Sequence, residues 1–168
     1  GHITNDDGLA TSALIFSENF TGFTAAGFAP SPTAGQLDSD VWRVVGLSDN
    51  TNPSYGFTGA AGGDFGRGLI STGDPASAGV YSPTSNNALI IQPTGAELDV
   101  GGFIEAKIQN TSGYTASSFD VAFDWAFRNN ATRSEDMQLS YSTDGVHFTA
   151  VPAANFSTPA AVDANGFV

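Results

Sequence analysis

Apolar and polar residues alternate most regularly between residues 119 and 128. Every odd position in this stretch is apolar, whereas the even positions are small or charged. An extended chain points successive side chains to opposite faces, so this alternation predicts a strand with one apolar face. We expect that face, which includes Phe123 and Trp125, to belong to the hydrophobic core and to be covered by a second layer.

A hairpin is predicted directly after this strand. Alternation resumes at residues 137–142 and again at 147–151, on either side of Asp144 and Gly145. An Asp-Gly pair accepts the positive φ angles of a tight turn, so the two runs should pair as antiparallel strands. Residues 118–151 therefore predict a β-meander.

The rest of the chain contains short apolar runs separated by turn residues, with no candidate helix of ordinary length. Strands are predicted at residues 13–20, 41–45, 88–92 and 101–110, of which 88–92 reads as a buried central strand. The 13 Phe residues and the many Thr, Ser, Asn and Gly residues agree with an all-β composition. We therefore expect an antiparallel β-sandwich. Long early loops and unevenly spaced turns favour a jelly roll over an immunoglobulin-like fold.

A glycine-rich segment at residues 54–79 invites comparison with phosphate-binding loops. It lacks the Gly-Lys-Ser/Thr ending of such loops and leads into no helix on which a phosphate could lie. We therefore interpret it as a long surface loop. Within it, Asp64 and Arg67 are expected to form a structural ion pair, with contact to a ligand as the alternative.

The 168 residues fit one domain, and we predict a flexible segment at residues 1–12 followed by a single sandwich at residues 13–168. Counts of 17 Asp plus Glu against 5 Lys plus Arg give a net charge of −12. Such a surface repels phosphate groups, which argues against binding to nucleic acid or to anionic membranes. It suits divalent cations or, alternatively, simple solubility in a saline extracellular setting. No apolar run approaches the length of a membrane span, and the lack of cysteine excludes disulfides and thiolate metal sites.

Glu18 is the strongest single-residue indication of a metal site. It lies on the apolar face of the strand predicted at residues 13–20, where an isolated carboxylate must be paired, hydrogen-bonded or metal-bound. A bulge that turns Glu18 outward is the alternative. Asp38, Asp40 and Asp49 lie in the loops that follow, and Ca²⁺ prefers several carboxylate, amide and carbonyl oxygens. We predict calcium as a cofactor that binds these four residues and stabilises the fold.

The polar face of the 119–128 strand is the predicted ligand-binding surface. Asp120, Asp124 and Arg128 offer directional hydrogen bonds to sugar hydroxyls. An exposed aromatic residue stacks on a sugar ring, and the candidates are Trp42 and Tyr55. The alternative for Trp42 is a place in the core. A spacer or adhesion module with no small ligand of its own fits the same composition.

No set of residues forms a sharp catalytic motif, although the carboxylates of Asp120 and Asp124, with Glu105 nearby, are spaced for acid–base work. Ser142, Asp144 and His147 surround the predicted hairpin turn, an exposed place with no oxyanion hole in view. Glu105 and Lys107 share one face of a strand, where exposed pairing with each other is expected in preference to acid–base catalysis. The sequence therefore favours a binding or structural module over an enzyme.

Five segments of the chain together form a recognisable pattern. They are Leu-Ile-Phe-Ser-Glu-Asn-Phe at 14–20, Val-Trp-Arg at 41–43, the predicted strand at 118–125, Ser-Tyr-Ser-Thr-Asp-Gly at 140–145 and Phe-Thr-Ala-Val at 148–151. In this order they resemble the jelly-roll modules of large secreted bacterial proteins, namely the cleaved-adhesin and choice-of-anchor type domains and the sandwich modules beside extracellular nucleases and calcium-repeat toxins. This resemblance implies a non-catalytic module, extracellular or on the bacterial cell surface, that serves adhesion or glycan binding in a larger protein. It also implies that Glu18 is a calcium ligand.

Under the same resemblance, the alternative is an accessory or catalytic jelly-roll domain of a secreted enzyme that degrades polysaccharide or nucleic acid. The chain departs from the pattern at its end, since such modules close with further strands and an acidic Asp-Asp stretch, whereas this one ends at Val168. Either the last strands of the jelly roll come from a separate segment, or the sandwich closes differently. In the first case the open sheet edge should pair with a missing C-terminal segment or with another chain.

Overall fold

The computed structural model describes residues 14–71, 75, 77–85, 87–98, 101–129 and 131–162, so the predicted flexible segment at 1–12 lies outside the described part. The described residues form almost nothing but strands and connecting loops, which confirms the prediction of an all-β protein. No helix among them is long and apolar enough to cross a membrane.

The secondary-structure elements of the described residues are short. In chain order they are β1 (Phe23–Ala29), β2 (Gly35–Asp38), β3 (Trp42–Val45), β4 (Leu69–Ile70), β5 (Gly79–Pro83), β6 (Ile90–Gln92), β7 (Phe103–Ala106), β8 (Asp136–Met137), β9 (Ser140–Tyr141), β10 (Thr149–Ala150), the 3-10 turn η1 (Pro152–Ala154) and β11 (Phe156–Ser157).

The chain divides into two compact units, each with its own ladders. Unit 1 comprises residues 1–71 and 75–120, and unit 2 comprises residues 72–74 and 121–168. Every sheet among the described residues has two or three strands. A single sandwich over residues 13–168 stays a prediction.

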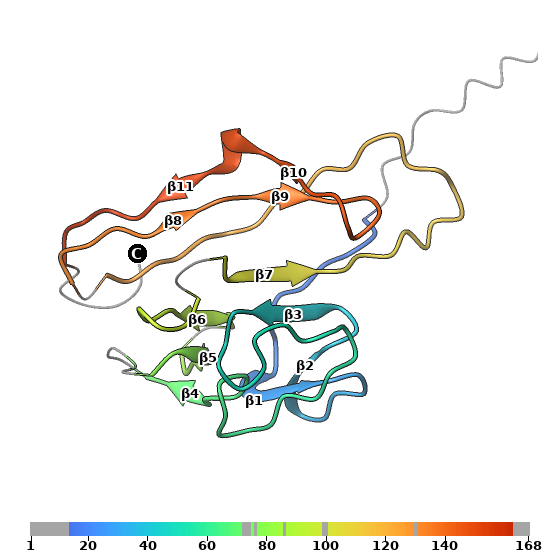
Figure 1. The fold of residues 1–168 in the computed structure, drawn as a ribbon. Coiled ribbons are helices and arrows are strands. Elements are labelled where there is room, and N and C mark those ends of the chain that lie inside the picture. The colour runs from blue at the N-terminus through green and yellow to red at the C-terminus, as the bar shows by residue number, and fades with distance from the viewer. Residues whose placement is uncertain are drawn as a thin grey trace, which may run out of the picture. The chain divides into compact units, whose positions relative to one another are not determined.

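Unit 1 contains three small sheets (Figure 1). β1 and β2 run parallel, β3 pairs antiparallel with β7, and β5 lies between β4 and β6. The β3–β7 ladder joins distant parts of the chain, with Arg43 opposite Glu105 and Val45 opposite Phe103.

Three of the predicted strands are present in unit 1, although each is shorter than expected. Residues 41–45 correspond to β3, residues 101–110 to β7, and residues 88–92 to β6. The prediction that 88–92 is a buried central strand is wrong, because β6 is half-buried at the edge of its sheet. The fully buried central strand of that sheet is β5.

The core of unit 1 is centred on aromatic contacts. The ring centroid of Phe28 lies 5.5 Å from that of Phe57 and 5.9 Å from that of Phe65, while Phe57 and Phe65 are 4.8 Å apart. Offset-stacked and edge-on pairs at these separations add to the free energy gained from burial alone. The buried residues of this cluster are Phe23, Ala25, Phe28, Leu37, Val44, Leu47, Phe65 and Val80.

The glycine-rich segment at 54–79 supplies part of this core and is not only a surface loop. Phe65 is 2% exposed, and Gly59 pairs with Phe28 through two backbone hydrogen bonds of 2.9 Å. A Cβ on Gly59 would lie 2.5 Å from the Cβ of Phe65, so this close approach requires glycine. Glycine at position 59 therefore allows the backbone to pack closely against the core.

The described residues of unit 2 form two two-residue ladders, β8–β11 and β9–β10. The predicted antiparallel pairing is confirmed, since Tyr141 lies opposite Thr149. The predicted tight turn is wrong, because residues 142–148 connect these paired positions, and Gly145 has a φ of +73° whereas the φ of Asp144 is not positive. The positive φ is the conformation for which glycine is favoured in turns.

The predicted strand at residues 119–128 is wrong, as is the assignment of its apolar face to the core. These residues are described but form no ladder. Phe123 and Trp125 are 45% and 47% exposed and pack edge-on against each other, with ring centroids 5.4 Å apart. Alternation provides an apolar face, but burial requires an opposing layer, and no described strand of unit 2 pairs with this stretch.

The first strand predicted, residues 13–20, is also wrong within its described part. Residues 14–20 form no strand, Leu14 is 85% exposed, and Phe20 has a φ of +55°. The first strand of the described residues, β1, begins only at Phe23, whose N–H donates to the Phe20 carbonyl in the preceding turn.

Candidate functional site

Unit 1 has a hollow of about 480 Å³ beside the start of β1, which we call the unit 1 hollow. Acidic, hydroxyl and amide side chains share its lining with apolar groups. The lining residues are Glu18, Phe20, Thr21, Gly22, Phe23, Pro32, Thr33, Ala34, Gly35, Gln36, Leu37 and Asp38.

The turn that leads into β1 forms one side of this hollow. The Phe20 N–H donates to Oε1 of Glu18 at 2.6 Å, and the Phe23 N–H donates to the Phe20 carbonyl at 3.1 Å. Polar side chains that accept neighbouring backbone N–H groups favour such turns over strands. Glu18 is consequently exposed, so its predicted inward orientation is wrong and the outward alternative is confirmed.

The segment between β1 and β2 forms another side. Oε1 of Gln36 accepts hydrogen bonds from the backbone N–H and the hydroxyl of Thr33, at 2.9 and 3.0 Å. Asp38, at the end of β2, accepts a bond from the Asp40 N–H through Oδ1 at 2.8 Å. These bonds hold the polar groups of the rim in defined positions.

The four predicted metal ligands do not converge. Glu18 and Asp38 line the unit 1 hollow, but Asp40 does not. Asp49 is held elsewhere, because its Oδ2 accepts the Asp64 N–H at 2.6 Å. Among the described residues no group of three or more His, Asp or Glu side chains is arranged to hold a metal ion.

Asp64 is the centre of a buried hydrogen-bond network and is only 2% exposed. Its Oδ2 accepts the Ser48 hydroxyl at 2.7 Å and the Asp49 N–H at 2.9 Å, and its Oδ1 accepts the Arg67 guanidinium. Arg67 also donates to the Ala78 carbonyl at 3.1 Å. The prediction of a structural Asp64–Arg67 pair is confirmed.

The environment of Asp64 favours its charged form. Burial alone would raise the pKa of this carboxyl, but the bonds from Ser48 and Asp49 and the positive charge of Arg67 outweigh burial and hold the pKa below its usual range. The network therefore contains a carboxylate at neutral pH, and the segment around residue 64 is pinned to the loop around residue 48.

The predicted ligand-binding residues are divided between the two units. Trp42 belongs to unit 1 and is half-buried, with its ring centroid 5.6 Å from that of Phe20 and 6.1 Å from that of Phe16. It packs against the core, as its alternative assignment proposed. Asp124 is exposed and Arg128 half-buried in unit 2, whereas Asp120 is the exposed last residue of unit 1.

A second polar group of unit 1 was not predicted, and we call it the Tyr55 cluster. It comprises Arg43, Tyr55, Phe103, Glu105 and Lys107. Oε2 of Glu105 accepts a hydrogen bond from Nε of Arg43 at 2.7 Å and lies 2.6 Å from Nη2 of the same guanidinium. The expected pairing of Glu105 with Lys107 is therefore wrong, since the antiparallel register places Arg43 directly opposite Glu105.

Tyr55 lies between the two cations of this cluster. The centroid of its ring is 4.9 Å from Cζ of Arg43 and 4.5 Å from Nζ of Lys107, distances at which cations are attracted to an aromatic face. Burial, reinforced by the Glu105 carboxylate and opposed by Arg43, raises the pKa of Tyr55 to about 12. The phenol is therefore neutral at physiological pH. The sequence names Tyr55 as a candidate for stacking on a sugar, but no local pattern places it between Arg43 and Lys107.

The hairpin turn of unit 2 brings Ser142, Asp144 and His147 together without forming a catalytic triad. Asp144 accepts both the Ser142 hydroxyl, at 2.9 Å, and Nδ1 of His147, at 2.7 Å. A triad requires the imidazole to contact the serine, whereas here the carboxylate lies between them. Hydrogen bonds from the His147 side chain and from the His147 and Val146 amides hold the pKa of Asp144 well below its usual range.

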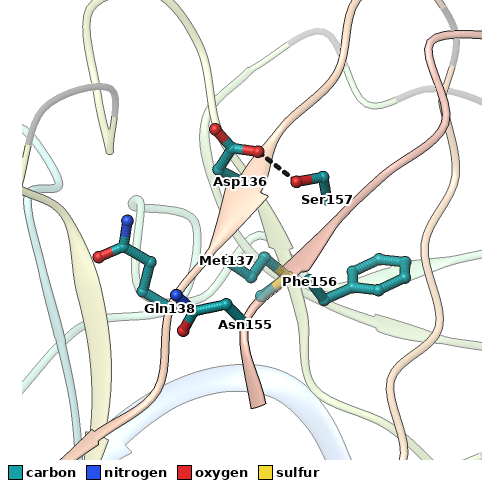
Figure 2. A pocket seen from close by; sticks show the side chains of 6 residues that line it. All are labelled: Asp136, Met137, Gln138, Asn155, Phe156 and Ser157. Carbon is teal, nitrogen blue, oxygen red and sulfur yellow. Dashed lines mark hydrogen bonds between the residues drawn. The ribbon is translucent and has the colours of Figure 1, made fainter. Parts of the chain in front are cut away.

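Unit 2 also has a smaller hollow, of about 230 Å³, at the β8–β11 ladder. Figure 2 shows Asp136 and Ser157 joined across this ladder by a hydrogen bond of 2.5 Å, with the amide side chains of Gln138 and Asn155 below them. None of the residues predicted from the sequence as ligands lies in its lining.

Comparison with known proteins gives no relative for this chain. No family model, no curated protein and no solved structure matches it. The resemblance to secreted jelly-roll modules therefore rests on the sequence pattern alone.

Proposed function

We propose that this chain is a non-catalytic, extracellular β-sandwich module of jelly-roll type that binds a glycan in the unit 1 hollow, as part of a larger secreted or surface protein. The observation that carries this proposal is the composition of the hollow. Carboxylates, hydroxyls and an amide share one concave lining of about 480 Å³ with phenylalanine and proline side chains.

Such a lining suits a sugar because a sugar ring has hydroxyl groups around its edge and apolar C–H groups on its faces. Glu18 and Asp38 each use one carboxylate oxygen for a local backbone N–H, and the second oxygen of each can accept a sugar hydroxyl. Thr21 and Thr33 add hydroxyls, and Phe20 adds an apolar surface. Placed polar groups within an otherwise apolar concave site are the usual source of orientation and specificity in small-ligand binding.

Calcium is proposed as a stabilising ion at the same hollow. Glu18 and Asp38 are the only two of the four predicted ligands in its lining. Ca²⁺ takes about six to eight oxygen ligands in proteins, so roughly four to six of them would come from backbone carbonyls, other side chains and water. An ion that binds only the native state at 100 times its Kd adds about 2.7 kcal/mol to the free energy of unfolding.

The glycan proposal is tested by screening the whole chain on a glycan array and measuring the affinity of each hit by calorimetry. Glu18→Gln and Asp38→Asn keep the shape of the lining and remove its charge, so each should weaken binding about tenfold or more through loss of a charge-assisted hydrogen bond. Asp124→Asn is the matched control, because Asp124 is exposed in unit 2. If Asp124→Asn weakens glycan binding as much as Asp38→Asn does, the glycan does not bind in the unit 1 hollow.

The calcium proposal has its own measurement. The Tm in excess calcium should exceed the Tm in excess chelator, and Asp38→Asn should remove most of that difference. Equal Tm values in calcium and in chelator would exclude the ion while leaving the glycan proposal intact.

A further inference from the structure

The Tyr55 cluster carries an excess of positive charge in a strongly acidic protein. Only 5 of the 168 residues are Lys or Arg, and the net charge is −12. Two of the five, Arg43 and Lys107, lie on the ring of one tyrosine. Glu105 is the one carboxylate in ion-pair contact with either of them among the described residues.

Arg43 is fully engaged within the cluster. Its Nε and Nη2 contact Glu105, and its Nη1 donates to the Pro53 carbonyl at 3.3 Å. Its guanidinium also lies 5.6 Å from the ring centroid of Phe103. Arg43 therefore positions the two rings and neutralises Glu105, and each of its three nitrogens already has a partner in the protein.

Lys107 is not engaged in the same way. Its side chain is exposed, and no carboxylate lies within 4.0 Å of Nζ in the described part of the chain. The ammonium group has three N–H donors, and at most one of them points at the ring of Tyr55. The remaining donors of this uncompensated cation are available to a ligand.

We propose that the Tyr55 cluster is a binding site for an acidic oligosaccharide, in which the carboxylate or sulfate of one sugar unit accepts hydrogen bonds from Lys107 and the ring of another unit packs on Phe103. Phe103 is 43% exposed and projects from the same face of the chain as Lys107, four residues away. The two residues are separated by about 13 Å along an extended strand, which accommodates more than one sugar unit.

The surrounding acidic surface does not prevent this contact. At physiological ionic strength the Debye length is about 8 Å, so remote carboxylates are screened while the contact between Lys107 and a bound anion is not. Asp40 is the acidic residue to consider, because its carboxylate lies beside Gly56, next to Tyr55. Removing that charge should strengthen binding of an anion.

The site is independent of the unit 1 hollow, and the test keeps the two separate. The probes are an oligogalacturonate, which carries carboxylates, a sulfated oligosaccharide, and a neutral cello-oligosaccharide, each titrated into the whole chain by calorimetry at about 0.15 M salt. We expect an acidic probe to bind and the neutral probe not to bind at this site. Whether the carboxylated or the sulfated probe binds more tightly identifies the anionic group.

The variants assign the binding to Lys107. Lys107→Gln should weaken the acidic probe about tenfold or more, Lys107→Arg should retain binding, and Asp40→Asn should strengthen it. Arg133→Gln is the matched control, since Arg133 is an exposed cation of unit 2 whose ion pair with Glu135 is long, at 3.8 Å. Glu18→Gln should have no effect on the acidic probe.

Two results would overturn the proposal. If neither acidic probe binds, Lys107 is an ordinary solvated lysine whose alkyl chain covers Tyr55. If Arg133→Gln weakens binding as much as Lys107→Gln, the attraction depends on net charge and not on this cluster. A Tm of Lys107→Gln equal to that of the parent shows that lost binding is not lost folding.

Discussion

Replacing Asp64 by asparagine is the most direct test of what holds unit 1 together. The new side chain would match the native one in size but would present an N–H₂ group to surroundings that consist of donors. The bonds from the Ser48 hydroxyl and the Asp49 N–H to a carboxylate contribute about 1.5 kcal/mol each, or about 3 kcal/mol together. Loss of the ion pair with Arg67 should cost less than the roughly 3–5 kcal/mol of breaking a fully buried pair. The reason is that 28% of the Arg67 side chain is exposed, so solvent screens its charge.

We therefore expect Asp64→Asn to lower the free energy of unfolding of unit 1 by about 3 kcal/mol, which for a unit of this size corresponds to a Tm about 12 °C lower. Urea denaturation in a Trp125→Phe background, followed by the fluorescence of Trp42, measures the loss, since Trp42 packs against the core of unit 1. Ser48→Ala should cost about half as much. Asp120→Asn is the control, and an exposed substitution of this kind changes stability by no more than about 0.5 kcal/mol.

The pH dependence of the same variant provides a second check. The pKa of Asp64 is lowered in the folded protein, so its contribution is complete above the ordinary value of about 3.9 and is lost as pH falls through the lower, folded pKa. The difference between parent and Asp64→Asn should therefore be constant at neutral pH and shrink below about pH 4. A variant within about 0.5 kcal/mol of the parent at pH 7 would refute the view that this network stabilises unit 1.

Three further predictions follow from the geometry. Gly59→Ala should destabilise unit 1 by about 1–3 kcal/mol in urea denaturation, because its Cβ would meet the Cβ of Phe65 at 2.5 Å; an unchanged midpoint would contradict this packing. Trp125→Phe should remove the iodide-quenchable part of the tryptophan emission, because Trp125 is 47% exposed; retention of that part would place this residue in a core after all. The carboxyl of Asp144 should titrate below the ordinary value of about 3.9 in an NMR pH series, and His147→Ala should raise its pKa, whereas an unchanged midpoint in the variant would show that the imidazole is not its main partner.

Features that depend on a few neighbouring residues could be predicted from the sequence. The pairing of residues 140–141 with residues 149–150 was predictable from the two alternating runs on either side of Asp144 and Gly145, although the connection is longer than a tight Asp-Gly turn. The all-β class likewise follows from local patterns and composition. The Asp64–Arg67 pair was predictable because the two residues are three apart in one glycine-rich segment.

Features that depend on distant partners could not be predicted. Alternation at 119–128 indicates an apolar face but does not supply the layer that would cover Trp125. The partner of Glu105 is Arg43, 62 residues earlier, and no local pattern shows that register. Glu18 was expected to face inward because strand periodicity was extended over it, whereas its carboxylate accepts the Phe20 N–H and turns the chain.

The β3–β7 ladder also sets the order in which this protein becomes stable during synthesis. Residues 42–45 emerge from the ribosome roughly 60 residues, or several seconds of translation, before the strand that pairs with them. Until β7 appears, β3 has an unpaired edge and Arg43 lacks its carboxylate, while closure of so long a loop slows folding. During that interval the unpaired edge of β3 can pair with other chains. Chains that end before residue 103, whether nascent or truncated, should therefore aggregate when they are expressed at high concentration.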